Sequence, residues 1–322
     1  MFHQTALKSV TLVILLLGLG AYVQTGGYYG RELVIEACIL AMLALSVDVV
    51  AGYGGMISMC HGALLGAAAY AFAAMTALLG WPPSLSFVIA IVASTLLATA
   101  IGAVSSRTQG IFFIMATLAF GQMVYVMIFD APMLGGDDGM AGVKRLNLDL
   151  VGINFKKSAP FAFACIALLA LSYGLAALML RSGFGRTLSG VKANEDRLRA
   201  LGVRVWWVKA RAFGFSGLLA GIAGVMAAQH TQFVSPELLL WTLSGEALVV
   251  VILGGLGTLV GPLVGAIALV FVKHEISSVT HYWHLFIGIA LILTVLAGGR
   301  GLYGQFEYVV TRARRRRAKD HA

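Results

Sequence analysis

The chain has 322 residues, of which 59% are hydrophobic and only 11% are charged, and its formal net charge is +9. This composition excludes an ordinary soluble domain and predicts a polytopic membrane protein, because long apolar stretches are typical of membrane-spanning helices. The stretches do not alternate apolar with polar residues, so we expect an all-α fold and no membrane β-barrel.

Ten apolar segments follow one another along the chain. The first is not followed by an A-x-A cleavage pattern, so we expect it to be an uncleaved helix. The eighth is too short to cross a bilayer at about 1.5 Å per residue unless it is broken or continues as a loop. We expect one transmembrane domain, residues 1–322, with about ten helices; eight helices is the alternative count. The segments are 9–25, 33–51, 62–80, 84–105, 111–129, 159–181, 211–229, 245–256, 258–273 and 284–298.

Basic residues are concentrated in two places, with eight from Arg181 to Arg211 and seven from Arg300 to Lys319. Because Lys and Arg collect in cytoplasmic loops, we expect both termini and the loop 182–210 to be cytoplasmic and the loop 130–158 to be external. The basic tail 312–319 is expected to meet anionic lipid. No nucleic-acid-binding fold accompanies these basic runs, so we expect no nucleic-acid partner.

A weak internal repeat links the two halves of the chain. "GMISMCHGALLGAAA" (Gly55–Ala69) is similar to "GGLGTLVGPLVGAIA" (Gly254–Ala268), with three glycines of each copy in register. Matching glycine-interrupted segments in two halves predict the central site of a transporter. Both copies also contain GxxxG, which is typical of close helix packing alone, so both interpretations stand.

Polar residues inside the apolar segments are candidates for a substrate pathway, because such groups are costly in a membrane. Pairing with a neighbouring helix is the structural alternative for each of them. We find no catalytic spacing and no clustered metal ligands, so neither an enzyme nor a metal site is expected. The candidates are Asp48, Ser58, His61, Thr117, Gln122, Ser244 and Glu246, with Gly254 and Gly261 of the second repeat.

The loop 182–210 contains a short segment with helix signals at both of its ends. Asn194 is a favourable N-cap, Glu195 and Asp196 fill the first turn, and Gly202 follows as a C-terminal stop. We therefore expect a surface helix from Glu195 to Leu201, with an ion pair between residues four apart. Such a helix suits a partner's groove, although a loop that only fixes topology is the alternative. The whole segment is Asn194, Glu195, Asp196, Arg197, Leu198, Arg199, Ala200, Leu201 and Gly202.

Five stretches in order along the chain carry a resemblance to a known family. They are "AGYGGMISMCHGALLGAAAYAFA" (51–73), "RTQGIFFIMATLAFGQ" (107–122), "GGDDGMAG" (135–142), "NEDRLRALG…KARAFGFSGLLAGIAG" (194–224) and "SGEALVVVILGGLGTLVGPLVGA" (244–266). The fourth resembles the coupling-loop motif of ABC importer permeases. Together they resemble the branched-chain amino acid permease family of LivM type. Asp48 and Cys60 depart from the family pattern, which usually has Asn and Gly there.

The resemblance implies a permease subunit of an importer for branched-chain or related amino acids, with residues 194–202 as a coupling helix that meets an ATPase. Expected partners are a second, homologous permease of LivH type, two ATP-binding subunits and a solute-binding protein. The chain contains no G-x-x-x-x-G-K-[ST], so ATP and Mg are expected on the ATP-binding subunits and no cofactor on this chain. Urea, short amides or aromatic carboxylates are alternative substrates, and a self-sufficient channel or an ion-coupled transporter is the rival class.

Overall fold

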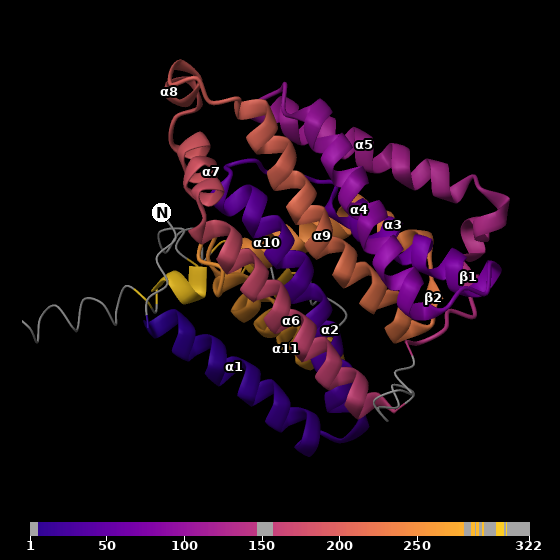
Figure 1. Cartoon of the computed structure of the whole chain (residues 1–322). Coiled ribbons are helices and arrows are strands. Elements are labelled where there is room, and N and C mark those ends of the chain that lie inside the picture. The colour runs from indigo at the N-terminus through magenta and orange to yellow at the C-terminus, as the bar shows by residue number, and fades with distance from the viewer. Residues whose placement is uncertain are drawn as a thin grey trace, which may run out of the picture.

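The computed structural model describes residues 6–146 and 157–279, together with a few short stretches between 285 and 307. Helices dominate this part of the chain and form one bundle (Figure 1). Seven of the described helices are long and apolar enough to cross a membrane. The prediction of an all-α polytopic membrane protein is therefore confirmed.

The helices follow the predicted apolar segments closely. α2 and α3 continue as short π-helices, η1 (Asp48–Tyr53) and η2 (Ala74–Leu78). The α-helices are α1 Ala6–Thr25, α2 Gly27–Val47, α3 His61–Ala73, α4 Pro83–Ser105, α5 Ile111–Phe129, α6 Ser158–Arg181, α7 Gly183–Ala193, α8 Glu195–Ala200, α9 Val205–Thr231, α10 Trp241–Gly254 and α11 Gly261–Val279. Short 3-10 turns span Pro132–Leu134, Gly136–Asp138 and Pro236–Leu239.

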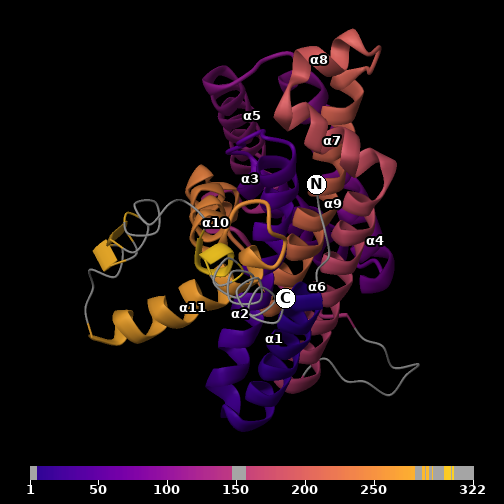
Figure 2. The same ribbon diagram turned by 90° about the vertical axis from the view of Figure 1, so that its left-hand side faces the viewer.

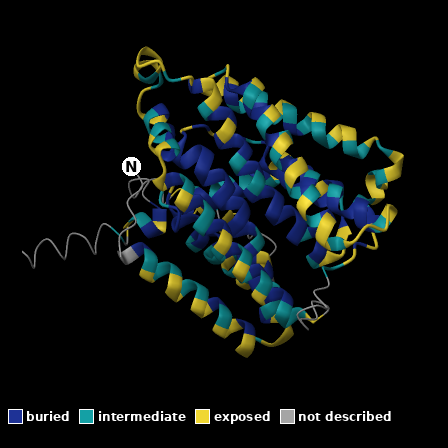
Figure 3. Ribbon diagram, viewed as in Figure 1, coloured by how far each residue is buried: buried dark blue, intermediate teal, exposed yellow. Residues whose placement is uncertain are grey.

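The centre of the bundle consists of α2 and α9. In the apolar stretches of these two helices 89% of the residues are buried. The corresponding share is 17% in α1 and in α5, which form the periphery (Figure 3). Glycines let α9 approach its neighbours closely: a Cβ at Gly217 would collide with Ala98 of α4, and one at Gly224 with the carbonyl of Leu65 in α3. Small residues serve this purpose in membrane helices because dispersion contacts between backbones replace a hydrophobic driving force.

The two ends of the bundle differ in structure. At one end, here called the β end, β1 (Met140–Ala141) pairs antiparallel with β2 (Phe233–Val234), Met140 opposite Val234. At the other, the α8 end, α7 and α8 form a helical corner (Figure 1). Figure 2 shows α11 leaving the bundle at an angle, away from α8. The described part of the loop 130–158 packs on α9 at the β end, where Arg145 Nε donates to the carbonyl of Gln229 at 2.8 Å.

Two sequence expectations need correction or qualification. The loop 182–210 is largely helical, because α7 (Gly183–Ala193) precedes the predicted short helix and buries Leu188 and Val191. The eighth segment is indeed short, since α10 has 14 residues and is followed by non-helical residues 255–260. Most of the tenth segment, 284–298, falls outside the described residues, and the basic tail 312–319 lies wholly outside them.

Candidate functional site

The two glycine-rich segments interrupt helices, and a single carboxylate from the helix before the first interruption binds the second. The first break, residues 54–60, separates η1 from α3, and the second break, residues 255–260, separates α10 from α11. Asp48 Oδ1 accepts a hydrogen bond from the Gly257 N–H at 2.6 Å, and its Oδ2 accepts one from Leu259 at 3.2 Å. Asp48 is fully buried. It therefore satisfies two backbone donors that a non-helical segment leaves without partners inside an apolar bundle.

Glycine is required where η1 approaches the second break. A Cβ at Gly52 would collide with Asp48 Oδ1 and would lie 2.7 Å from the Gly257 nitrogen. Gly257 itself has φ +77°, a left-handed conformation that glycine adopts without strain. The backbone of η1, which leads into the first break, therefore lies directly against the second break.

Two polar candidates in helices beside the breaks, His61 of α3 and Ser244 of α10, also have hydrogen-bond partners within the protein. His61 Nε2 lies 2.8 Å from Ser216 Oγ, and Ser216 donates to the Ser46 carbonyl at 2.8 Å. The Gly62 N–H donates to Ser244 Oγ at 2.7 Å, which satisfies a free donor at the start of α3. His61 and Ser244 are fully buried. Their contacts match the structural alternative, pairing with a neighbouring helix.

Ser58 and Thr117 hold the first break to its surroundings. Thr117 Oγ1, on α5, accepts the Met59 N–H at 3.2 Å. Ser58 Oγ lies 3.2 Å from Cys60 Sγ, and both side chains are fully buried. Gln122, one turn further along α5, differs from them. Its Oε1 is buried and has no hydrogen-bond partner among the described residues.

The glycines of the repeat are packed tightly against backbone. A Cβ at Gly254 would collide with the Gly261 carbonyl, and one at Gly261 would lie 2.6 Å from the Gly255 carbonyl. In the GxxxG motifs, a Cβ at Gly66 would lie 2.5 Å from Leu239 Cγ, and one at Gly265 would collide with the Val250 carbonyl. The glycines of these motifs therefore allow close packing, and the pathway interpretation stays a prediction.

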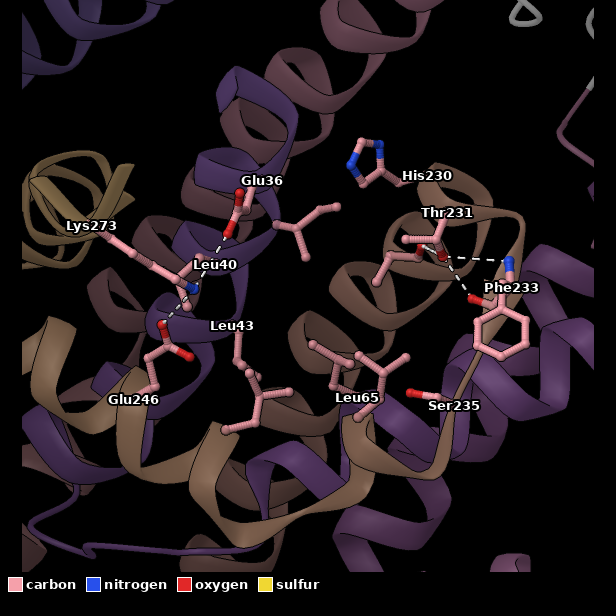
Figure 4. A pocket seen from close by; sticks show the side chains of 14 residues that line it. Glu36, Leu40, Leu43, Leu65, His230, Thr231, Phe233, Ser235, Glu246 and Lys273 are labelled. Carbon is pink, nitrogen blue, oxygen red and sulfur yellow. Dashed lines mark hydrogen bonds and ion pairs between the residues drawn. The ribbon is translucent and has the colours of Figure 1, made fainter. Parts of the chain in front are cut away.

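Glu246 lies apart from the other candidates, in a pocket towards the β end. Lys273 Nζ stands between two carboxylates, 3.8 Å from Glu246 and 3.7 Å from Glu36, as Figure 4 shows. The pocket has a volume of about 460 Å³ and one aliphatic wall. Its lining residues are Glu36, Ile39, Leu40, Leu43, Leu65, Ala227, His230, Thr231, Phe233, Ser235, Leu238, Leu243, Glu246 and Lys273.

Sequence reasoning selected Glu246 but not Glu36 or Lys273. Glu36 is one of only two charges between Leu33 and Ser106, which was the signal that could have identified it. Lys273 ends an apolar segment, where a charged residue is common. Its position beside Glu36 depends on the contact between α11 and α2, which no local pattern encodes.

The predicted short helix exists, and both of its ends are capped as expected. Asn194 Oδ1 accepts the Arg197 N–H at 2.9 Å. At the other end the Val203 N–H donates to the Leu198 carbonyl at 3.1 Å, and Gly202 has φ +81°. This hydrogen bond and the left-handed glycine are features of a Schellman motif. The helix α8 runs from Glu195 to Ala200, with Leu201 as its C-cap.

The side chains of α8 divide into an inner and an outer set. Glu195 pairs with Arg199 at 2.5 Å, as predicted, and also with the buried Lys209 of α9 at 2.7 Å. Leu198 turns inward, since a Cβ at Gly190 of α7 would lie 3.1 Å from its Cδ1. Leu201 is 73% exposed. Asp196, Arg197 and Ala200 are exposed as well, so a charged outer face with one leucine remains for a partner.

A polar cavity of about 590 Å³ separates the α7–α8 corner from the first break. Its walls include Gly54 and Gly55 of the break, Gln109 of the loop before α5, and Asn194 at the corner. At its edge Lys192 Nζ of α7 donates to the Gly52 carbonyl at 2.6 Å. The corner therefore has a direct hydrogen bond to the π-helix that carries Asp48.

Sequence comparisons show which known proteins the chain is similar to. The chain is 26% identical over 290 residues to the high-affinity branched-chain amino acid transport system permease protein LivM of Escherichia coli K12, covering 82% of this chain and 67% of that protein. It is 25% identical over 286 residues to LivM of Salmonella typhimurium, with the same coverage. A shorter match, 30% over 156 residues, covers 44% of this chain and 45% of the autoinducer 2 import system permease protein LsrC of Escherichia coli O9:H4.

No solved structure matches the chain significantly. The family model described as "Branched-chain amino acid transport system / permease component" matches residues 31–296, which contain both glycine breaks, the α7–α8 corner and the pocket. The chain therefore belongs to the family of permease components of branched-chain amino acid transport systems.

Proposed function

We propose that this permease subunit moves branched-chain amino acids across the inner membrane as part of an ABC importer, with energy from separate ATPase subunits. The observation that carries the proposal is the α7–α8 corner. It presents a capped, charged helix whose outer face is exposed while its inner face is fastened to α7 and α9. A self-sufficient channel or an ion-coupled transporter has no use for such a corner.

The proposed orientation places the α8 end and both termini in the cytoplasm and the β end outside. Basic side chains support it, because Arg181, Arg186, Arg197, Arg199 and Arg204 lie in or beside α7 and α8. A second, homologous permease of LivH type completes the membrane part, within membrane lipid. Two ATP-binding subunits, which hold ATP and Mg, meet the α8 end, and a solute-binding protein meets the β end.

The pocket supports an amino acid as the substrate. Two carboxylates and one ammonium group give it partners for both charges of a zwitterion, and Leu40, Leu43 and Leu243 form an aliphatic wall. A branched aliphatic side chain suits that wall, since apolar surface is stabilised by removal from water. Urea and short amides offer no charge to these groups, and an aromatic carboxylate offers only one.

The test is uptake of radiolabelled leucine into proteoliposomes that contain this chain, the second permease, the ATPases and the binding protein. We expect uptake that requires internal ATP and is inhibited by isoleucine and valine, but not by urea or benzoate. Leucine uptake without ATP or without the ATPase subunits would contradict the importer. If urea or benzoate inhibits ATP-driven uptake and valine does not, the assignment of branched-chain amino acids as the substrates would be contradicted.

A further inference from the structure

We propose that Lys192, Gly52 and Asp48 form the mechanical link through which movement of α8 reaches both glycine breaks. The proposal rests on the proposed function, because it assigns the route between the ATPase contact and the membrane part. Lys192 and Asp48 act here as positioning residues, and neither is required to touch the substrate.

The first part of the link makes α7 and α8 one mechanical unit. Asn194 is both the last cap of α7 and the N-cap of α8, so no free linker separates the two helices. Leu198 of α8 packs on Gly190 of α7. Because α8 has only six residues, it has little stability of its own and takes its position from these contacts. A force applied to α8 therefore moves α7.

The second part joins α7 to the membrane segment. Lys192 Nζ donates to the Gly52 carbonyl at 2.6 Å, and its stem covers Gly55, where a Cβ would lie 3.0 Å from Lys192 Cγ. Gly52 belongs to the π-helix η1. Short π-helical turns are rare and are frequent at functional sites. Lys192 therefore ties α7 to the π-helical end of α2.

The third part carries the movement across to the second half of the chain. Asp48 lies one π-turn before Gly52 and binds the N–H groups of Gly257 and Leu259 with separate oxygens. A carboxylate can accept a hydrogen bond at each of its two oxygens. An asparagine amide has one oxygen only, and its NH2 group would face the second backbone N–H without forming a hydrogen bond. Any rotation of η1 therefore displaces the second break together with the first.

The experiment compares Lys192→Met with Arg186→Met in the complete reconstituted importer. Arg186 is an exposed residue of the same helix and serves as the matched control. We expect Lys192→Met to retain the ATPase subunits and their ATP hydrolysis, while leucine uptake per ATP falls about tenfold. Lys192→Arg, which keeps a donor for the Gly52 carbonyl, should recover most of the loss, and Arg186→Met should behave as the wild type.

A distance measurement separates a mechanical role from a merely structural one. Spin labels on Leu96→Cys, on the exposed face of α4, and on Leu256→Cys in the second break report the movement of the break against the bundle with and without trapped ATP. We expect the ATP-dependent change seen in the otherwise wild-type chain to be lost with Lys192→Met or Asp48→Asn. The double variant should lose no more of the ATP-dependent distance change than either single variant, because both substitutions act on one link.

The outcomes are distinguishable. Unchanged uptake per ATP in Lys192→Met, or an unchanged ATP-dependent distance, would overturn the link while leaving the importer intact. Additive losses in the double variant would also overturn it. If the wild-type chain neither retains the ATPases nor takes up leucine with ATP, the proposed function itself fails.

Discussion

Glu195 at the start of α8 and Lys209 in α9 form a 2.7 Å ion pair that fastens the helix corner to the central helix of the bundle. The lysine side chain is only 4% exposed and the glutamate 16%, so water competes little for either charge. Asp196, the next residue, is 91% exposed and has only a 3.7 Å contact with Arg199. These adjacent acidic residues therefore give a matched pair of variants.

Glu195→Gln should loosen α8 from α9. The variant loses the charge that faces Lys209. We expect the contact between α8 and α9 to lose about 1–2 kcal/mol of stability, since hydrogen bonds to charged groups contribute more than neutral ones. Hydrogen exchange of the α8 amides should become about tenfold faster in this variant. Asp196→Asn should leave exchange unchanged, because exposed ion pairs contribute little. Equal exchange in the two variants would show that the pair does not hold the corner.

Gly217→Ala should destabilise the bundle through the contact between α9 and α4. The added methyl group would collide with Ala98, and forced overpacking typically costs about 1–3 kcal/mol. Thermal unfolding of the detergent-solubilised chain should begin at a lower temperature. Gly174→Ala in α6 is the control, because nothing lies within 4 Å of its added Cβ. The same melting temperature for both variants would contradict the close α4–α9 approach.

Glu246→Gln should slow transport without affecting assembly. The variant removes one of the two carboxylates beside Lys273 and, with it, a proposed partner of the substrate ammonium. We expect the initial rate of leucine uptake, measured with saturating loaded binding protein, to fall by about tenfold or more, because a hydrogen bond to a charged group contributes about 1.5–3 kcal/mol. Glu237→Gln, an exposed residue on the same end, should transport normally. A normal rate in Glu246→Gln would remove the pocket from the pathway.

Cysteine labelling tests the orientation of the two ends. The three native cysteines, Cys38, Cys60 and Cys165, are buried, so they give little background. Met133, near the β end, is 80% exposed, and Leu201, in α8, is 73% exposed. An impermeant maleimide added to intact cells should label Met133→Cys but not Leu201→Cys, and the latter should react only after permeabilisation. The reverse pattern would invert the topology and contradict cytoplasmic docking.

Local chemistry made some of these features predictable from the sequence. The apolar segments determined the helices, and the caps at Asn194 and Gly202 fixed α8 to within a residue, because both signals act over one turn. The short α10 was likewise expected from its length alone. What these features share is that the residues responsible for them lie within the element itself.

Other features depend on partners far away in the chain and could not be predicted locally. Asp48 was selected as a pathway residue, but its hydrogen-bond donors lie 209 and 211 positions away. The two-residue strands β1 and β2 are too short to show a strand pattern. The helix α7 was hidden because its charged residues suggested a loop, although Leu188 and Val191 form a buried face.

The central claim is that α8 is the contact through which separate ATPases drive transport, and Ala200→Pro tests it most directly. Proline inside α8 costs about 3 kcal/mol of helix stability, which a six-residue helix does not have in reserve. Ala200 is exposed, so the bundle should still insert and fold, and Ala200→Ser should behave as the wild type. The measurement is co-purification of the ATPase subunits with the tagged permease. The account predicts that Ala200→Pro loses the ATPases at normal expression, whereas full retention of the ATPases would contradict it.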